Sequence, residues 1–330
     1  MTVAVVILNW NGIELLKQFL PSVVDFSSEA TVYVADNAST DNSVDFVIEN
    51  FPQVNIIQNK INGGYSKGYN DALSGLDEDL FILLNSDVQV TPHWLPPIIE
   101  LFQKNEDLGA AQPKILDFKN PEFFEYAGAA GGFLDKLGYP YCRGRIFNSL
   151  EKDEGQYDDE TDIFWASGAC LAIRNSAFFK IGGLDEDYFA HQEEIDVCWR
   201  LHNFGYAIKY TPKSIVYHVG GATLNHMNPR KTFYNFRNSL FNLLKNLPGY
   251  QLLWILPARM ILDGIAAIKF LIEGRGKHFL AILNAHMSFY KMFPVFLEKR
   301  KKVPGKFGSF SKFSVVCSHY LLGIKKFSEI

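Results

Sequence analysis

The feature that most constrains the fold is an uninterrupted apolar run from Val3 to Leu8, which ends at the polar residue Asn9. A strand with one face in water alternates apolar and polar residues, so a continuous run indicates a strand that is covered on both faces. Further strands are predicted at residues 31–35, 54–58 and 80–84. Helices cover both faces of such strands in α/β proteins, so the sequence predicts that fold class.

Helical patterns stand between these strands, most clearly at residues 13–24 and 66–75. The alternation of strand and helix predicts a doubly wound, mostly parallel sheet of Rossmann-like type. Ligands bind such sheets beyond the carboxyl ends of the strands. Asn9, Asp36 and Asp87 stand at three of these ends, so we expect one binding edge that includes all three.

The 330 residues suffice for one large α/β domain with an appendage. We place a catalytic domain at residues 1–240 and a helical region at residues 241–330. Residues 117–160, rich in Gly, Tyr and charge, are predicted to form loops and a short hairpin over the binding edge. Later helices are predicted at residues 176–181 and 194–204, and short strands at residues 207–211 and 214–218.

The C-terminal region is basic, with 13 Lys and Arg against four Asp and Glu in residues 251–330, while the whole chain has a net charge of −4. Residues 253–272 are nearly long enough to span a bilayer, but Arg259, Asp263 and Lys269 lie on one side of the helix that they would form. That pattern is typical of an amphipathic helix that lies in a membrane interface.

A second apolar segment, residues 278–297, is followed by a basic cluster at residues 299–302. Basic clusters beside apolar helices attract anionic lipid head groups, so we expect this region to associate with an anionic membrane surface. The alternative is a helical subdomain that packs on the acidic body of the chain and balances its charge.

The four cysteines, Cys142, Cys170, Cys198 and Cys317, show no CxxC spacing, which argues against a zinc site and against a disulfide framework. A reducing compartment is therefore expected. The first strand begins at Val3 without a basic leader or a cleavage site, so no signal peptide is expected. We expect a cytoplasmic protein, peripheral on the cytoplasmic face of the cell membrane, with no nucleic acid partner.

An apolar strand delivers Asn85, Ser86 and Asp87 to the binding edge. A diphosphate needs a divalent cation to neutralise it, and hard cations take oxygen ligands such as the carboxylate of Asp87. His218 ends a later strand, and an imidazole there would be a further ligand that favours Mn²⁺ over Mg²⁺. Taken singly, a strand-end Asp is often a turn residue and a lone His is usually structural.

Two further features have a functional and a structural interpretation. Asp36 can accept hydrogen bonds from a base or a ribose, or it can serve as a turn residue before the next helix. The Gly-rich segment Asn62–Asn70 is neither a Walker A loop nor a dinucleotide-binding fingerprint. Its glycines would let the backbone approach a ligand closely, unless it is a plain turn.

Three carboxylates, Glu193, Glu194 and Asp196, cluster at the start of a predicted helix. Acidic residues favour helix amino termini for electrostatic reasons alone. The functional interpretation is a general base that takes the proton of an acceptor hydroxyl. Glu193 and Asp196 would raise the affinity of Glu194 for that proton, because like charges oppose its ionisation.

Taken together and in order, these motifs resemble the inverting family 2 glycosyltransferases of the GT-A fold, especially their bacterial rhamnosyltransferase-like branch. The resemblance covers about residues 1–240, and its specificity lies in the order of eight segments. The segments are Val6–Gly12, Val34–Asp41, Asn62–Asn70, Leu83–Asp87, Ser167–Ala169, Gly182–Glu186, Glu193–Arg200 and His218–Gly221.

The resemblance implies roles for individual residues. Asp87 would bind a divalent metal, Mn²⁺ or Mg²⁺, with help from His218. Glu194 matches the catalytic base, and Asp196 matches the second acid of the same motif. Trp165, Ser167, Gly168 and Glu193 would line the sugar and acceptor pocket. The donor nucleotide would be held by Asn9, Asn11, Asp36, Asn62, Gly63, Gly64, Asn70, Asn85 and Ser86.

Two positions depart from the family pattern. The family's Asp-x-Asp motif appears here as Asn85-Ser86-Asp87, so we expect Asp87 to hold its metal only when the diphosphate is present. The base position is usually Asp, and Glu194 is one methylene longer. Glu193, Glu194 and Asp196 are therefore all candidates for the group that takes the proton.

The resulting hypothesis is an inverting transfer of a sugar, from dTDP-rhamnose or a UDP-sugar, to a hydroxyl of a glycan or polyprenyl-linked acceptor in cell-surface polysaccharide synthesis. One alternative, a nucleotidyltransferase, would carry a Gly-rich loop with Lys or Arg after the first strand, where this chain has Asn9-Trp10-Asn11-Gly12. The other is a non-catalytic member that binds a nucleotide sugar or glycan, or scaffolds a membrane assembly, because one carboxylate supports less metal chemistry than two.

Overall fold

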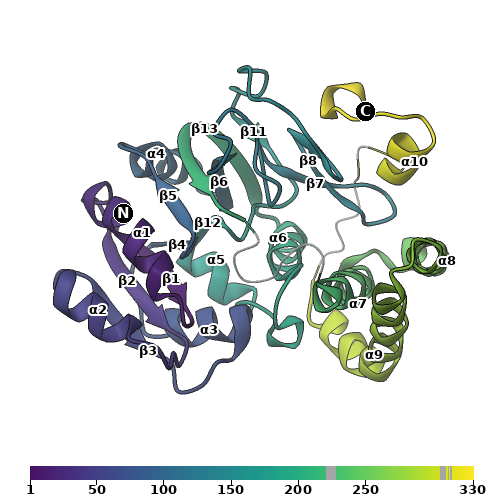
Figure 1. Ribbon diagram of the computed structural model, residues 1–330, viewed down its shortest axis with the longest axis horizontal. Coiled ribbons are helices and arrows are strands. Elements are labelled where there is room, and N and C mark those ends of the chain that lie inside the picture. Colours follow the sequence, from purple (N-terminus) through teal and green to yellow (C-terminus); the bar gives the residue numbers. More distant parts are fainter. Residues whose placement is uncertain (221–227, 305–309, 311, 313) are drawn as a thin grey trace.

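The protein is described by a computed structural model that covers residues 1–220, 228–304, 310, 312 and 314–330. Gly221, the last residue of the motif that begins at His218, lies outside the described residues. Within these ranges, a mixed sheet of nine strands forms the centre of the molecule and helices flank it (Figure 1).

Eight of the strands form one continuous path across the sheet. Their order is β11 (Thr161–Asp162), β13 (Ala207–His218), β6 (Leu108–Asp117), β12 (Cys170–Arg174), β4 (Leu80–Asn85), β1 (Val3–Asn9), β2 (Thr31–Asp36) and β3 (Asn55–Gln58). The ninth strand, β5 (Val88–Val90), lies off this path and pairs with β13.

Strands β1 to β4 pair in parallel, and the apolar runs of β1 and β4 fit their places inside the sheet, with a strand on each side. Val3, Val5 and Ile7 of β1 enter the core on one face, whereas Ala4 and Val6 enter the core on the other. The prediction that the first strand is covered on both faces is therefore confirmed.

The register of the parallel strands brings their carboxyl ends together. Asn9 stands opposite Asp36 on β2, and Leu8 stands opposite Asn85 on β4. The side chains that follow these strands therefore start from one edge of the sheet, as expected for an α/β protein.

The sheet is not wholly parallel, because β12 runs against both of its neighbours, β4 and β6. Strand β13 also differs from the sequence-based expectation, which divided it into two short strands. It is one strand from Ala207 to His218, and its pairing with β6 shifts register between Thr211 and Ile215. A bulge of this kind bends a strand without ending it. The predicted class, an α/β fold with a mostly parallel sheet, is confirmed.

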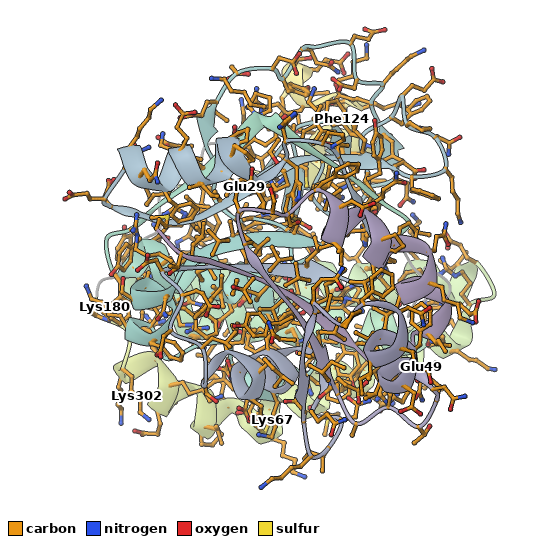
Figure 2. The ribbon with its side chains drawn as sticks, turned by 90° about the vertical axis from the view of Figure 1, so that its left-hand side faces the viewer. Glu29, Glu49, Lys67, Phe124, Lys180 and Lys302 are labelled. Carbon is orange, nitrogen blue, oxygen red and sulfur yellow. The ribbon has the colours of Figure 1, made fainter. Side chains whose placement is uncertain are left out.

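Two groups of helices cover the two faces of the sheet, and Figure 2 shows side chains filling the space between the layers. Charged side chains such as Glu49 and Lys180 lie at the periphery in that view. One face is covered by α1 (Ile13–Asp25), α2 (Ser43–Asn50) and α4 (Leu95–Lys104). The other face is covered by α3 (Gly64–Leu73), α5 (Asn175–Lys180) and α6 (Glu193–Asn203).

A small antiparallel sheet accounts for the predicted hairpin region. Its strands are β7 (Gly132–Leu134), β8 (Pro140–Cys142), β9 (Arg145–Ile146) and β10 (Ser149–Leu150). The C-terminal segment returns to this sheet through α10 (Val315–Tyr320), and the Phe327 ring packs 5.3 Å from the Phe133 ring.

Three long helices confirm that the C-terminal region is helical, and they lie together beside the sheet domain (Figure 1). They are α7 (Pro229–Asn246), α8 (Gly249–Ile272) and α9 (Gly276–Lys301). Helix α7 crosses residue 240, the predicted boundary, so both predicted regions share this helix. The Phe241 ring of α7 stacks on the Phe296 ring of α9 with centroids 3.8 Å apart.

Helix α8 has an unusual orientation. The charges of Arg259 and Asp263, expected on the water-facing side of an interfacial helix, are buried against the protein and pair over 2.9 Å. Arg259 also donates hydrogen bonds to the carbonyl oxygen of Gly138 and to Ser239 Oγ. The outward side is apolar instead, with Leu253 and Ile272 about 80% exposed. Two of the three charges on the predicted polar side therefore face the body, which supplies their partners, whereas the third, Lys269, is exposed.

Helix α9 is long and apolar enough to cross a bilayer, judged by length and composition alone. One side of α9 is nevertheless packed on α7, as the burial of Phe289 and Phe296 shows. Other side chains of α9, including Met287 and Tyr290, are exposed.

Candidate active site

The carboxyl ends of β1 and β2 place Asn9 and Asp36 side by side. Asn9 Nδ2 donates a hydrogen bond to Asp36 Oδ1 over 3.1 Å, and the Ser39 backbone N–H donates to Asp36 Oδ2 over 2.9 Å. Asn9 Oδ1 is buried, faces Gly12 and has no hydrogen-bond partner among the described residues. Buried polar atoms are nearly always hydrogen-bonded, so this oxygen is available for a donor group of a ligand.

Asn11 organises the loop next to this pair. Its Oδ1 atom accepts a hydrogen bond from the Thr40 backbone N–H over 2.7 Å, and its own backbone N–H donates to Ser39 Oγ over 2.9 Å. Its φ of +50° lies in the left-handed region, which Asn tolerates better than most residues. Asn11 therefore fixes the shape of the loop that follows β2.

The Gly-rich turn lies against the end of β2. Asn62 Oδ1 accepts hydrogen bonds from the Gly64 backbone N–H and from Asn37 Nδ2, both over 3.0 Å. Gly64 has a φ of +76°, and a Cβ atom there would lie 2.6 Å from the carbonyl oxygen of Phe189. Only glycine fits that close approach, so the turn and the segment around Phe189 share one boundary.

Gly63 and Asn70 lie at opposite ends of the Gly-rich segment and make different contacts. A Cβ atom on Gly63 would lie 2.6 Å from Lys67 Cγ. Asn70 Nδ2 donates to the Leu184 carbonyl oxygen over 2.8 Å, and the Leu184 backbone N–H donates to Asn70 Oδ1 over 2.9 Å. The Asn70 amide thus joins α3 to the segment before α6.

The end of β4 and the end of β13 bring Asp87 and His218 together. Asp87 Oδ1 lies 3.1 Å from His218 Nε2, and Asn85 Nδ2 lies 3.5 Å from the same nitrogen. Glu125, from the loop after β6, places Oε2 3.3 Å from His218 Nδ1. Burial alone would lower the pKa of His218, but the charge of Glu125 and the contact with Asp87 raise it to about 10.

The pair Asp87 and His218 fits a divalent cation. Two ligand atoms at about 2.1 Å from one octahedral cation lie roughly 3 Å apart, close to the separation of Asp87 Oδ1 and His218 Nε2. In the described ranges, no group of three or more His, Cys, Asp or Glu residues could hold a metal. A cation here would therefore take most of its ligands from a diphosphate and water. It would also have to displace the proton that His218 holds between the two carboxylates.

Glu193 and Glu194 begin α6 beside Tyr65 and Gly168. Tyr65 Oη donates a hydrogen bond to the Gly168 carbonyl oxygen over 2.9 Å, and a Cβ atom on Gly168 would lie 3.8 Å from Glu194 Cβ. Glu194 is half-buried, and burial raises its pKa to about 7. Glu193 is buried with Oε2 unpaired among the described atoms, and burial followed by the charge of Glu194 raises its pKa well above its usual range.

One short segment, Gly168 and Ala169, lies between the end of β4, which leads to Asp87, and the carboxylates of α6. The Asn85 backbone N–H donates to the Ala169 carbonyl oxygen over 3.0 Å, and Gly168 precedes Ala169. Asn85 therefore contacts Ala169, and the neighbouring residue Gly168 lies next to Glu194. The structure brings the two predicted groups to neighbouring positions on the same edge.

Asp196 points away from this edge, into a buried cluster of charges. Its Oδ2 atom accepts hydrogen bonds from Arg200 Nε over 2.8 Å and from Lys245 Nζ over 3.0 Å, and Asn246 Nδ2 donates to Oδ1 over 3.0 Å. Burial opposes ionisation, but Arg200 and Lys245 hold the pKa of Asp196 below its ordinary value. Both carboxylate oxygens are thus occupied by the protein.

Trp165 and Ser167 are also buried, and both pack beneath the segment that lies at the edge of the sheet. The Trp165 ring packs so closely on Gly132 that a Cβ atom there would lie 2.1 Å from it, and Trp165 Nε1 donates to the Phe133 carbonyl oxygen over 3.0 Å. Ser167 Oγ accepts a hydrogen bond from the Ala169 backbone N–H over 3.2 Å. These residues shape the segment that carries Gly168.

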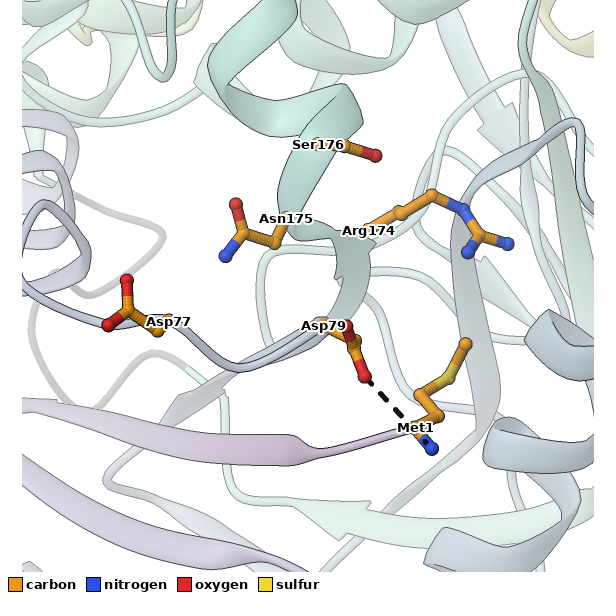
Figure 3. Close-up of a pocket in the computed structure, with 6 residues that line it drawn as sticks. All are labelled: Met1, Asp77, Asp79, Arg174, Asn175 and Ser176. Atoms are coloured by element: carbon orange, nitrogen blue, oxygen red, sulfur yellow. Dashed lines mark ion pairs between the residues drawn. The ribbon is translucent and has the colours of Figure 1, made fainter.

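A cavity of about 350 Å³ lies elsewhere, at the amino-terminal ends of β1 and β4. Figure 3 shows Asp79 and the Met1 amino group, 4.0 Å apart, among the residues that line it. This cavity is on the opposite edge of the sheet from Asn9, Asp36 and Asp87, so it is not part of the candidate site.

Glu125 and Tyr65 belong to the candidate site but were not predicted from the sequence. Glu125 lies in a stretch that was predicted only as loops, and nothing in its local sequence points to His218. Tyr65 belongs to the Gly-rich turn, but its hydrogen bond to Gly168 spans 103 residues. Asn238, Asn242 and Asn246 of α7 were not identified either, although their spacing of four residues places them on one side of a helix.

Comparisons with known proteins identify the family and the fold. The family model described as "Glycosyl transferase family 2" matches residues 4–182, more than half of the chain. An N-acetylglucosaminyl-diphospho-decaprenol L-rhamnosyltransferase of Mycobacterium tuberculosis is 27% identical over 273 residues, covering 77% of this chain and 87% of that protein. A poly-beta-1,6-N-acetyl-D-glucosamine synthase of Staphylococcus epidermidis is 24% identical over 212 residues, covering 62% of this chain and 47% of that protein.

Two solved structures share the fold. The structure of S. aureus TarS 1-349 in complex with UDP-GlcNAc has a TM-score of 0.56 at 13% identity, covering 92% of this chain and 93% of that chain. A mannosyltransferase from Pyrobaculum calidifontis in complex with GDP-Man and Mn²⁺ has a TM-score of 0.52 at 16% identity, covering 91% and 84%. The fold of this chain is therefore that of GT-A glycosyltransferases.

Proposed function

This chain belongs to glycosyl transferase family 2, and on that premise we propose that its strand-end residues transfer a sugar from a nucleoside diphosphate sugar to an acceptor hydroxyl with inversion. The observation that carries the proposal is the position of Asp87 and His218 beside Glu194 at one edge of the sheet. A cation-binding pair next to a carboxyl group with a pKa of about 7 combines the two requirements of such a transfer.

The donor nucleoside would lie across β1 and β2. Asn9 offers an unpaired buried oxygen, and Asp36 offers a carboxylate beside it. Asn11 and the turn that includes Asn62, Gly63 and Gly64 would form the walls around the base and ribose. Asn85 and Ser86 would lie beside the diphosphate, whereas the amide of Asn70 is engaged with Leu184 and would act through the shape of the turn.

Asp87 and His218 would hold a divalent metal, Mn²⁺ or Mg²⁺, together with the diphosphate. The imidazole favours Mn²⁺, because nitrogen ligands suit Mg²⁺ poorly. When bound, the metal would neutralise charge that builds on the departing diphosphate. The mannosyltransferase with a similar fold was solved with GDP-Man and Mn²⁺, which supports this choice.

We assign the general base to Glu194. Glu193 is buried, and burial followed by the charge of Glu194 raises its pKa well above the usual range, so its ionised form is disfavoured and it suits the role of the base less well. Asp196 is ionised but fully engaged by Arg200, Lys245 and Asn246. Glu194 is half-buried, and its pKa of about 7 matches the requirement for accepting a proton at neutral pH.

The transfer would proceed in one displacement. Glu194 takes the proton of the acceptor hydroxyl, and the hydroxyl oxygen forms a bond to the anomeric carbon. The bond between that carbon and the diphosphate oxygen breaks, and the nucleoside diphosphate leaves with the electron pair. Attack from the face opposite the leaving group inverts the anomeric configuration. Gly168 would border the sugar and the acceptor, and the buried residues Trp165 and Ser167 would hold its segment in place.

The donor and the acceptor follow from chemistry and from the relatives. The relative from Mycobacterium tuberculosis is named as an L-rhamnosyltransferase that acts on a decaprenol-linked sugar, which supports dTDP-rhamnose as donor and a polyprenyl-linked glycan as acceptor. A UDP-sugar is the second candidate, because the TarS structure contains UDP-GlcNAc. We place the reaction in cell-surface polysaccharide synthesis.

The helical region would bring this reaction to the cytoplasmic face of a membrane. Helices α8 and α9 turn apolar side chains outward, among them Leu253, Ile261 and Met287, each more than 60% exposed. Exposed lysines border this face, including Lys269 and Lys291. An apolar face with a basic rim suits an anionic lipid surface. The alternative of packing on the body accounts for the inner face, where Lys299 pairs with Asp185 and Asp187, but leaves the outer face bare.

The experiment that tests the function is a thermal-shift panel of dTDP-, UDP- and GDP-sugars with and without Mn²⁺. A ligand that binds the folded state stabilises it in proportion to ln(1 + [L]/Kd). We expect one nucleotide class to raise the melting temperature, and Mn²⁺ to increase that shift. A panel in which no nucleotide sugar shifts the melting temperature with Mn²⁺ present would exclude the proposed donor site.

A further inference from the structure

Helix α7 carries three buried asparagines on one face. Asn238, Asn242 and Asn246 are each at most 2% exposed, and their spacing of four residues places them one above another. A buried amide is unfavourable unless its hydrogen bonds are satisfied, so apolar residues would serve a purely structural face better. The hydrogen bonds that this row of three asparagines makes explain why amides, and not apolar side chains, occupy this face of α7.

The row faces the short loop that precedes Glu193 and Glu194. Three of the four residues in this loop have a positive φ although none is glycine: Phe189 at +64°, His191 at +67° and Gln192 at +72°. The left-handed conformation is unfavourable for residues with a Cβ atom. A loop of this kind persists only where its surroundings hold it.

Asn238 holds the centre of the loop. The two hydrogens of its Nδ2 atom are shared among three carbonyl oxygens, those of Tyr188 at 3.1 Å, Ala190 at 3.0 Å and His191 at 2.7 Å. The carbonyl of His191 belongs to the same peptide unit as the backbone nitrogen of Gln192. Asn238 therefore fixes the orientation of the peptide from which α6 begins.

Asn242 holds the two ends of the same loop. Its Nδ2 atom lies 3.3 Å from the Gln192 carbonyl oxygen, to which it donates, and its Oδ1 atom accepts a hydrogen bond from Tyr188 Oη over 2.8 Å. One turn later, Asn246 donates to Asp196, three residues after Glu193. The three amides thus follow the chain from Tyr188 into the first turn of α6.

We propose that Asn238 and Asn242 are positioning residues that hold the strained loop 189–192 in the conformation that aims Glu194 at the acceptor hydroxyl. This proposal rests on the role of Glu194 as general base under the proposed function. Neither asparagine touches the donor edge formed by Asn9 and Asp36. Phe189 of the loop borders Gly64 of the donor turn, so removal of the asparagines should lower the rate of the transfer step much more than it weakens nucleotide binding.

The test uses the whole 330-residue chain with three single variants and one double variant. Asn238→Ala and Asn242→Ala remove the amides, and Ser239→Ala is the matched control. Ser239 is a buried polar residue of α7 whose hydroxyl contacts Phe236 and Arg259 and not the loop. The double variant Asn238→Ala/Gln192→Gly places glycine where φ is +72°, so the loop can adopt its conformation without the amide.

The first readout is transfer from the nucleotide sugar selected by the thermal-shift panel to N-acetylglucosaminyl diphosphate on a short polyprenol. We expect Asn238→Ala to lower kcat at least tenfold, with the KM for the donor changed less than twofold. Gln192→Gly should restore most of that loss, and Ser239→Ala should behave as wild type. An unchanged kcat in both asparagine variants, or an equal loss in Ser239→Ala, would overturn the proposal.

The second readout needs no substrate, so it separates this proposal from the proposed function. Hydrogen exchange of the peptides that cover residues 187–196 should accelerate at least tenfold in Asn238→Ala and stay at the wild-type rate in Ser239→Ala. Unchanged exchange in Asn238→Ala would refute the role of the asparagine even in a protein without transferase activity. If exchange is faster in Asn238→Ala but the protein transfers no sugar, the asparagine would still hold the loop. Only the role of the loop in positioning a general base would then be refuted.

Discussion

Asp87 Oδ1 lies 3.1 Å from His218 Nε2, although 131 residues separate the two in the sequence. The contact forms because β4 and β13 both end at the same edge of the sheet. Each partner is an ordinary strand-end residue alone, but together they present an oxygen and a nitrogen to one point. That arrangement is the basis of the first prediction.

Asp87→Asn should abolish the part of the nucleotide-induced thermal shift that depends on Mn²⁺. The amide keeps the size of the side chain but loses the charge that a cation needs. The control is Asp79→Asn, at the opposite end of the same strand, which should retain the full Mn²⁺ effect. An Mn²⁺-dependent shift that survives in Asp87→Asn would place the metal elsewhere.

The second prediction concerns pH. Because burial raises the pKa of Glu194 to about 7, kcat should rise with pH up to about 7 and then level off. Glu194→Gln should lower kcat at least roughly 100-fold, the usual contribution of a general base. A pH profile that is already flat at pH 5 would contradict the assignment.

The same shift has a consequence for stability that can be measured without substrate. The pKa of Glu194 is raised in the folded state, so the folded state holds its proton more tightly than the unfolded chain does. This contribution to stability is present below the unfolded pKa and is lost as the pH rises towards 7. Urea unfolding should therefore show Glu194→Gln to be more stable than wild type at pH 8, with a smaller difference at pH 5.

The third prediction addresses the buried charges behind the site. Lys245 is buried between Asp185 and Asp196, at 2.7 Å and 3.0 Å from their oxygens. Lys245→Met would leave two buried carboxylates short of a partner, so we expect the free energy of unfolding to fall by about 3–5 kcal/mol. Lys17→Met, which removes an exposed pair with Glu14, should cost less than about 1 kcal/mol. Equal losses in the two variants, measured by urea unfolding, would show that burial of the cluster contributes little.

The fourth prediction tests the close approach of α3 to the sheet. A Cβ atom on Gly68 would lie 2.9 Å from Leu8 Cδ1 and 3.0 Å from Asn37 Nδ2. Gly68→Ala should destabilise the protein by about 1–3 kcal/mol and weaken nucleotide binding, because it pushes α3 away from the ends of β1 and β2. Gly75→Ala is the matched control, since no atom lies within 4 Å of the added Cβ. Wild-type stability and nucleotide affinity in Gly68→Ala would show that the edge tolerates this shift.

The fifth prediction tests the outer face of α8. Ile261, Ile265 and Ile268 are 66%, 58% and 56% exposed. Their joint replacement by Ser should reduce flotation with vesicles that contain anionic phospholipid at least tenfold, without lowering the melting temperature. The control replaces Ile48 and Ile61, which are equally exposed on the sheet domain, and should float as wild type does. If the triple variant instead loses self-association seen in wild type by light scattering, the face is a dimer interface and not a membrane surface.

Much of the sheet could be predicted because its strands are recognisable one at a time. The apolar run from Val3 to Leu8 identifies a covered strand without knowledge of its neighbours, and the order of strands and helices identifies the parallel class. The reversed strand β12 could not be predicted in the same way. Its residues are as apolar as those of β4, and only the path of the chain determines the direction in which it runs.

The candidate site was predictable where the chemistry follows a strand end and unpredictable where it depends on distant partners. Asn9, Asp36 and Asp87 meet because parallel strands end together. The orientation of Asp196 depends on Lys245, which lies 49 residues away, so the acidic run alone could not separate it from Glu194. Likewise, the spacing of Arg259 and Asp263 predicts that they share one side of α8, but not that this side faces the protein.

Helix α7 holds the loop of Glu194 on one side and packs against α8 and α9 on the other (Figure 1). Packed helices lie about 8–10 Å apart, so two such layers place Glu194 roughly 20 Å from any flat surface on which α8 and α9 rest. The packing of α7 against α8 and α9 sets that distance. An acceptor anchored in such a surface could react only if its hydroxyl stands at that height, so the enzyme would select acceptors by the length of their head group.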